Sequence, residues 1–573
     1  MDFGVRVSRV VCALALLLIG GFVSPVAAQD AAPQSNQLLL PNLHGLRLVS
    51  KPSEIQKSGY DRRGVTIDGP YILYRPGIYE KLQGFIGKPL YTADLQRITA
   101  VIAEWYKSKN RPFVDVAFPE QDISTGVLQA VVTEFKVGKV IVKGNRWFSS
   151  GLLRSQIDLS TGDPIDVVKL NRDIGRINQN DFLNVSVVTQ KSDTPGDTDI
   201  VLQTEDDFPL RFNTSYTNNG VPITGRDRWN IGFTWGDALW LGEQFSYQYT
   251  SNVDFWLHPK RVPVEEGKAD FGAHSANYMI PFSWGDSLVL TGAYSQVRPQ
   301  IGPDFGEVGV SWQAGLRYVV PLAFHGWDTS ELQFGADFKR TNSNLQFGGV
   351  DISNVTTDIA QFIISYSGAV SDAWGQTRLA NRIALSPGHL TGGNTDEAFQ
   401  PSTTHTGTPY AKARYAYDDA SVVRLTPLPW GMGLVTRLEA QWSSAVLAPS
   451  ERLEAGGIET VRGYDEYAAS GTEGVLFTQE IRSPQIQPLH DLISDSINDQ
   501  LQLDAFFDFA YLRDQKVTTG TKHGVTIDSV GAGFQYQIST YFSARFDYGW
   551  QLQSAPGATK RGSQIDVSIT LNN

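Results

Sequence analysis

Cysteine is almost absent from this sequence, which has one in 573 residues, Cys12, close to its start. Beyond that position, disulfide bonds, thiolate metal ligands and a cysteine nucleophile are all excluded. The 8 histidines are scattered, none of them stands in a His-Glu-x-x-His spacing, and the Gly-x-Ser-x-Gly elbow of serine hydrolases is missing. We therefore expect a protein that is not an enzyme, with no catalytic residue, no metal and no cofactor.

Long apolar runs are also missing after the first 28 residues, so we expect no transmembrane helix there. The one such run, Val10–Val23, follows two arginines and precedes small residues at 26–28. That order is typical of a secretory signal peptide, which we place at 1–28. The formal net charge is -12. Because phosphate binding needs a concentrated basic surface, nucleic acid is not expected as a partner.

Aromatic residues are plentiful, at 11% of the chain, although the mean hydropathy is only -0.21. A transmembrane barrel has such values, because alternate residues face lipid and water. From 208 to 573 the apolar residues recur with a period of two, as at 210–217 and 542–550, and aromatic residues gather near the ends of these runs. Lipid offers the backbone no hydrogen bonds, so the sheet must close on itself. We predict a membrane β-barrel of about sixteen antiparallel strands.

Two copies of a shorter pattern precede the barrel, at 60–135 and 136–207, each in the order strand, helix, helix, strand, strand. The first is expected to open with a strand at Val65–Leu73 and to carry a helix that Thr92 caps. In the second, Asp166 is expected to cap a helix. The buried stripes of these two helices are predicted at Leu95, Ile98, Ile102 and Trp105, and at Leu170, Ile174 and Ile177. Each copy can form one small α+β core.

The stretch 29–59 separates the predicted signal peptide from the first module. Pro33, Pro41 and Pro52 interrupt it, and no helix longer than a few turns fits between them. We therefore expect a linker or an extended arm.

Three short motifs point to a family. The first module contains Pro119-Glu120-Gln121, with Gly126 five residues after the glutamine; the barrel contains Gly456-Gly457 and then Val461-Arg462-Gly463-Tyr464; a later strand contains Phe506-Phe507-Asp508. A four-residue motif alone is weak evidence, but the combination with two modules and a leader is specific. The chain resembles the two-partner secretion transporters, also called haemolysin secretion/activation proteins. These belong to a superfamily of outer-membrane barrels with periplasmic POTRA domains.

The resemblance implies a contact inside the barrel. In the strand 501–511, period-two alternation turns Phe506 and Asp508 toward the lumen. The loop at about 449–472 is expected to fold inward, so that Arg462 meets Asp508 in the forked geometry that suits guanidinium and carboxylate. Val461, Gly463 and Tyr464 belong to the same lock between loop and strand. In a wet lumen this pair is expected to fix position more than to add stability. Without the resemblance, the residues favour a plainer interpretation, in which Arg462 lies in an exposed extracellular loop and Asp508 is one of many lumen charges.

The resemblance also implies a function, with the barrel in the outer membrane and the POTRA domains in the periplasm. These domains are expected to bind an unfolded secreted partner exoprotein by β-augmentation. The partner then passes through the lumen without nucleotide hydrolysis. Outer-membrane lipid and the barrel-assembly machinery are the other expected partners. Two alternatives stay open: a factor that inserts other outer-membrane proteins, which would affect many of them, and a passive porin, which would conduct solutes steadily.

Overall fold

The computed structural model describes residues 36–573, except 253–269, 299–304, 323–325, 348–349, 403–406 and 495. The predicted signal peptide at 1–28 therefore lies outside the described residues. The chain divides into two compact units. One comprises the first module with 160–168 and 191–198, and the other comprises 140–159, 169–190 and everything from 199 onward. Within the described ranges, no helix is both long and apolar enough to cross a membrane.

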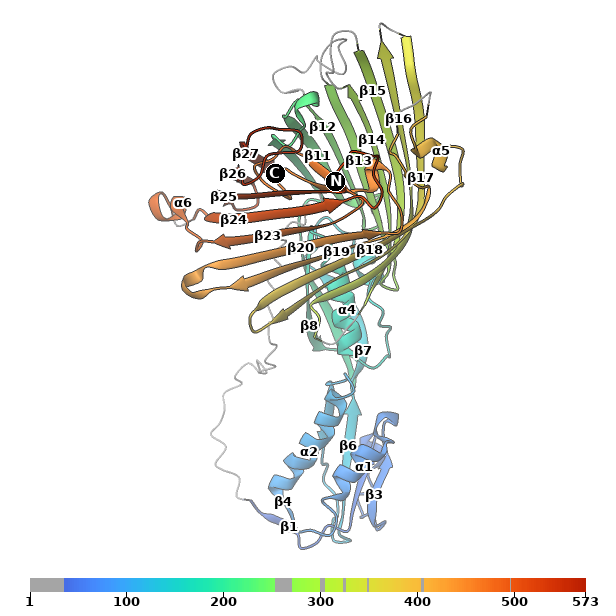
Figure 1. Ribbon diagram of the computed structural model, residues 1–573. Helices are drawn as coiled ribbons and strands as arrows, with labels where there is room; N and C mark the ends of the chain where they lie inside the picture. The colour runs from blue at the N-terminus through green and yellow to red at the C-terminus, as the bar shows by residue number, and fades with distance from the viewer. Residues whose placement is uncertain are drawn as a thin grey trace. The chain divides into compact units, whose positions relative to one another are not determined.

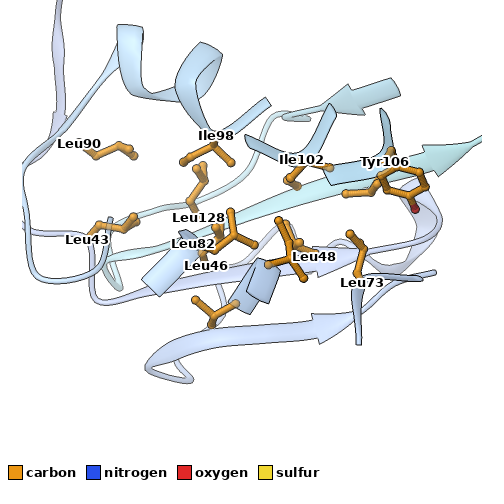
Figure 2. Packing of buried hydrophobic residues seen from close by; sticks show 14 of the residues in the cluster. Leu43, Leu46, Leu48, Leu73, Leu82, Leu90, Ile98, Ile102, Tyr106 and Leu128 are labelled. Carbon is orange, nitrogen blue, oxygen red and sulfur yellow. The ribbon is translucent and has the colours of Figure 1, made fainter. Parts of the chain in front are cut away.

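The first module is a four-stranded sheet covered by two helices (Figure 1). Its strands, in sheet order, are β3 (Gly64–Asp68), β2 (Gly45–Val49), β6 (Val127–Glu134) and β5 (Val114–Ala117). Strand β2 runs parallel to both of its neighbours, and β5 is antiparallel to β6. The helices are α1 (Pro76–Gln83) and α2 (Thr92–Lys107), and a short pair, β1 (Leu38–Leu40) with β4 (Leu90–Tyr91), lies before α2. Figure 2 shows leucines of β2 packed against the predicted stripe of α2, where Ile98 and Ile102 are fully buried.

The prediction of an arm at 29–59 is wrong for its described part. Strand β2 lies in the middle of the sheet, with Leu46 and Leu48 fully buried. Pro41 and Pro52 lie outside this strand, one before it and one in the 3-10 turn η1 (Pro52–Glu54), so neither has to donate a ladder hydrogen bond. The first module therefore begins earlier than residue 60.

Two local predictions in the first module also need correction. Strand β3 ends at Asp68 and not at Leu73, because Pro70 cannot donate to a ladder, and a 3-10 turn η2 (Tyr71–Leu73) follows. Thr92 is the first helical residue of α2 and not its cap. The backbone N–H of Tyr91 donates to the Asp94 carboxylate at 2.9 Å, while the Thr92 hydroxyl bonds the backbone of Gln37.

The second module is a three-stranded sheet in the order β7 (Lys136–Lys143), β9 (Asp197–Asp206) and β8 (Leu183–Lys191), with helices α3 (Ser150–Ser155) and α4 (Val167–Ile177). The predicted cap is confirmed, because the Asp166 carboxylate accepts from the backbone N–H of Val168 at 3.0 Å. Leu170 and Ile177 of α4 are buried, and Ile174 is half-buried.

The barrel is a closed sheet of sixteen antiparallel strands in the described part of the chain, which confirms the predicted fold (Figure 1). Its strands are β10 (Leu210–Thr217), β11 (Arg228–Ala238), β12 (Glu243–Ser251), β13 (Asp270–Pro281), β14 (Ser287–Arg298), β15 (Phe305–Pro321), β16 (Thr329–Phe347), β17 (Val350–Asp372), β18 (Gly375–Pro387), β19 (Arg414–Pro427), β20 (Gly433–Ser443), β23 (Glu473–Arg482), β24 (Asp499–Arg513), β25 (Gly524–Ile538), β26 (Phe542–Gln551) and β27 (Ser563–Asn572). Strand β27 closes the barrel by pairing with β10. Asn573 extends this seam, since its side-chain oxygen accepts from the N–H of Phe212 at 2.8 Å.

The connections between strands differ at the two ends of the barrel. Those between β11 and β12, β17 and β18, and β25 and β26 are tight turns, whereas 388–413 and 444–472 are long. Transmembrane barrels have short periplasmic turns and long extracellular loops. Two short helices lie in connections, α5 (Asp396–Phe399) in the loop 388–413 and α6 (Pro488–Leu492) between β23 and β24, as do the 3-10 turns η3 (Pro222–Thr224) and η4 (Pro429–Gly431). The connection 444–472, which we call the inward loop, therefore starts from the extracellular end.

Strand β24 shows the predicted alternation. Its residues Asp504, Phe506 and Asp508 are buried, whereas Leu503, Ala505 and Phe507, which alternate with them, are exposed on the other face. The buried face of β24 points into the lumen, against the inward loop, and the exposed face is the one that meets lipid.

Candidate functional site

The inward loop is a compact hairpin with its own pair of short strands. After the turn η5 (Pro449–Glu451), β21 (Leu453–Ala455) pairs with β22 (Ala469–Gly471). Gly456 and Gly457 follow β21 with φ of 114° and 95°, in the left-handed region that favours glycine. A Cβ on Gly456 would lie 2.2 Å from the carbonyl oxygen of Asp465, so only glycine allows the hairpin to close here. The Gly-Gly motif therefore shapes the loop.

The tip of the loop lies directly on the barrel backbone. Gly463 has φ of 90°, and a Cβ there would lie 2.7 Å from the carbonyl carbon of Gly549 in β26. A Cβ on Gly549 would lie 2.6 Å from the backbone nitrogen of Gly463. The side chain of Gln551, also in β26, donates to the carbonyl oxygen of Gly463 at 2.8 Å. Two glycines facing each other thus let loop and wall touch without an intervening side chain.

Arg462 makes the contact that the resemblance implied. Its Nε lies 2.8 Å from Oδ2 of Asp508 and its Nη2 lies 3.0 Å from Oδ1, which is a bidentate pair. The backbone N–H of Arg462 also donates to Oδ2 at 3.1 Å. One carboxylate of β24 therefore fixes both the side chain and the backbone of the loop tip.

Other acids surround the same guanidinium. Nη1 of Arg462 donates to Glu480 of β23 at 2.8 Å and to Asp547 of β26 at 3.3 Å, and it lies 4.0 Å from Asp504 of β24. We call Glu480, Asp504, Asp508 and Asp547 the acid cluster. The ring of Phe506 lies under the guanidinium, with its centroid 3.4 Å from Cζ, close enough for a cation–π contact.

The expectation of a wet ion pair is wrong. The side chain of Arg462 is 3% exposed and that of Asp508 is 0% exposed, because the loop itself covers them. Arg482 pairs with Glu480 at 2.7 Å and Arg545 pairs with Asp547 at 2.6 Å, so two further arginines offset part of the negative charge of the cluster. A buried, hydrogen-bonded charge pair strongly resists the loss of one partner.

Val461 and Tyr464 hold the tip by packing. Both are fully buried, and they share an apolar cluster with Ala510 and Leu512 of β24. The hydroxyl of Tyr464 is within hydrogen-bond reach of the carbonyl oxygens of Asp528 at 3.0 Å and Gln553 at 2.7 Å. The motif residues 461–464 thus contact four neighbouring strands or their ends.

The sequence analysis did not assign several residues to this site. Glu480, Asp504 and Asp547 face the lumen on separate strands, and Gly549 stands two residues after Asp547. Their inward positions could be read from the alternation of each strand. The register between strands, which brings them beside Arg462, could not.

The motif of the first module has a structural role in its sheet. The side-chain amide of Gln121 donates to the carbonyl oxygen of Gln129 at 2.7 Å and accepts from its N–H at 2.8 Å. Strand β5 ends at Ala117, so at Gln129 the side chain of Gln121, in place of a neighbouring strand, bonds the backbone of β6. Gly126 has φ of 81°, and a Cβ there would lie 2.7 Å from the ring of His44. Pro119 accepts a bond from Gln121, whereas Glu120 is exposed.

In the part of the chain that the structure describes, no group of three or more histidine, cysteine, aspartate or glutamate side chains is arranged to hold a metal ion.

Comparison with known proteins identifies the family. Residues 196–536 match the family described as haemolysin secretion/activation protein ShlB/FhaC/HecB. The chain belongs to this family. Residues 63–134 match the POTRA domain of ShlB type, and 135–205 match the POTRA repeat described as surface antigen variable number repeat. The protein is therefore an outer-membrane transporter of the two-partner secretion type that exports a partner protein, with its POTRA domains in the periplasm.

Individual relatives are distant in sequence. The chain is 24% identical over 476 residues to the heme/hemopexin transporter protein HuxB of Haemophilus influenzae, covering 79% of this chain and 76% of that protein. It is 22% identical over 382 residues to the outer membrane transporter CdiB-2 of Burkholderia pseudomallei strain 1026b, covering 65% and 61%.

Two solved structures share the fold. CdiB from Escherichia coli has a TM-score of 0.72 at 16% identity, covering 95% of this chain and 92% of that one. BamA from Haemophilus ducreyi lacking POTRA domains 1-3 has a TM-score of 0.51 at 13% identity, covering 88% and 98%. At these identities the likeness concerns architecture alone.

Proposed function

We propose that the transporter exports its partner exoprotein unfolded through the barrel lumen, and that the inward loop gates this path. The observation that carries the proposal is the bidentate contact between Arg462 and Asp508, which holds the loop inside the barrel. In this proposal the Arg462 contact keeps the loop in place at rest, and the loop tip leaves the acid cluster when the partner enters.

Recognition of the partner is assigned to the POTRA domains. In the first domain the sheet order leaves β3 and β5 at the two edges, and in the second it leaves β7 and β8 there. An edge strand presents unpaired N–H and C=O groups, to which an extended segment of a partner can add as a further strand. A partner segment bound in this way is recognised mainly through its main-chain groups and less through its side chains, which suits an unfolded exoprotein.

Export in this proposal needs no nucleotide, metal or cofactor, and the protein has no catalytic role. Folding of the partner outside the cell biases its movement outward. Outer-membrane lipid meets the exposed faces of the strands, such as Leu503 and Phe507 of β24. The barrel-assembly machinery is proposed to insert the barrel itself, and nucleic acid is not a partner.

The test is Arg462→Ala in the full-length transporter, with Arg424→Ala as its matched control. Arg424 also forms a bidentate pair, with Asp372 at 2.8 Å for both bonds, but at the turn end of β19 and away from the loop. We expect Arg462→Ala to lower the amount of exported partner at an unchanged level of assembled barrel, because the loop is then no longer positioned to yield when the partner enters. Arg424→Ala should leave export intact. Normal export by an assembled Arg462→Ala transporter would refute the role of the loop.

A further inference from the structure

A second buried charge ties the inward loop to the barrel. Glu451, the last residue of η5, precedes the hairpin at the base of the loop, and its side chain is 0% exposed. Its Oε1 accepts from Nζ of Lys339 in β16 at 2.6 Å. Its Oε2 accepts from the side-chain amide of Gln361 in β17 at 3.0 Å and from the hydroxyl of Tyr417 in β19 at 2.9 Å. We call these four residues the stem anchor.

The stem anchor is built into the wall. The guanidinium of Arg382 in β18 donates to the hydroxyl of Tyr417, and the hydroxyl of Tyr415 donates to the side-chain oxygen of Gln361 at 2.9 Å. Two of the three donors that face Glu451, the side chains of Tyr417 and Gln361, are thus held by partners in the wall. A buried carboxylate that left this set of donors would be unpaired at a high free-energy cost.

The two anchors have opposite polarity. At the loop tip, the loop supplies the cation of Arg462 and the wall supplies acids. At the stem, the loop supplies the acid of Glu451 and the wall supplies the ammonium of Lys339. Like charges repel, so neither end of the loop can occupy the place of the other.

The two anchors also lie on different parts of the wall. The stem anchor uses β16, β17 and β19, whereas the acid cluster uses β23, β24 and β26. Gly456 and Gly457, with their left-handed φ angles, stand between Glu451 and Arg462 along the chain. Glycine can change from the left-handed region to other backbone conformations at little steric cost. The chain between the two anchors can therefore bend at Gly456 and Gly457.

We propose that Glu451 is a second positioning residue of the inward loop, which holds the stem to the wall independently of Arg462. During export the tip then leaves the acid cluster while the stem stays in place. This inference rests on the proposed gating by the loop. It differs from a single lock, in which release of Arg462 would free the whole loop.

Cysteine reporters can separate the two anchors. In a Cys12→Ser background each introduced cysteine is the only thiol of the chain. Ala448→Cys reports on the stem and Val461→Cys on the tip, and both positions are buried. We expect Glu451→Gln to raise the maleimide labelling rate at position 448 by about tenfold or more, with no change at 461. Arg462→Ala should do the reverse.

Glu454→Gln is the matched control, because Glu454 is a half-buried glutamate of the same loop outside the stem anchor. It should change neither rate. Labelling that rises at both positions in both variants would establish a single lock, and an unchanged rate at 448 in Glu451→Gln would remove Glu451 from the anchor. Should Glu451→Gln not assemble, Lys339→Gln removes the charge from the wall side and is expected to expose 448 alone.

Export completes the test. In assembled barrels we expect Glu451→Gln to lower partner export by about fivefold or more, and Glu451→Asp, which keeps the charge, to restore part of it. Normal export by Arg462→Ala would refute the gating role of the loop. Loss of export in Arg462→Ala, together with normal export by a Glu451→Gln protein whose stem is labelled freely, would refute only the need for the second anchor during export.

Discussion

The stability of the closed state of the inward loop, in which Arg462 contacts the acid cluster, should depend strongly on the charge of Asp508. Asp508→Asn keeps the size of the side chain but removes one acceptor oxygen, and it turns an NH₂ group toward the guanidinium of Arg462. In the native protein Asp508 accepts three bonds from Arg462, at 2.8, 3.0 and 3.1 Å, and its side chain is fully buried. Removing one partner of a buried charge pair costs about 3–5 kcal/mol. Arg462 still reaches Glu480, so we expect the lower end, about 3 kcal/mol.

That free energy corresponds to about a hundredfold shift in the equilibrium between loop-closed and loop-open barrels. The assay is single-channel conductance of the purified transporter in planar bilayers, read as the fraction of time spent in open states. Asp372→Asn is the control, because it breaks the half-exposed pair with Arg424, worth about 0–1 kcal/mol. An open fraction in Asp508→Asn equal to that of the control would refute the reasoning.

Two further predictions concern packing. Gly549→Ala places a methyl group 2.6 Å from the backbone of Gly463, so it should push the loop tip off β26 and lower partner export at constant barrel level. Gly292→Ala, with no atom within 4 Å of its Cβ, should leave export intact, and equal export by both variants would contradict the close approach. Leu48→Ala in β2 should destabilise the first POTRA domain by about 2–5 kcal/mol, seen as faster proteolysis of that domain in the full-length protein. Leu38→Ala, at a 48% exposed position, should have little effect, and the same small effect at Leu48 would argue against β2 as a core strand.

The barrel was predictable because its signal repeats. Every strand adds another run of period two, so the lipid-facing and lumen-facing sides of β24 could be assigned residue by residue. The pairing of Arg462 with Asp508 needed more than alternation. It came from a motif resemblance, and the residues alone favoured an exposed Arg462.

Other parts of the structure could not be derived from local pattern. Strand β2 has only five residues between Pro41 and Pro52, too short a run for its alternation to outweigh the prolines. The acid cluster and Gly549 depend on the register between strands. Glu451 depends on the loop reaching a wall whose strands β16, β17 and β19 lie far from it in sequence. Such contacts are set by closure of the barrel and not by any short segment.

Export of one partner by this transporter can be measured directly. The proteins of the medium, the cell surface and the outer membrane are quantified in cells with the native chain, without it, and with Arg462→Ala. We predict that one large exoprotein disappears from the medium and surface in the last two cases, while the other outer-membrane proteins keep their levels. Loss of many outer-membrane proteins with the exoprotein still exported would contradict the account.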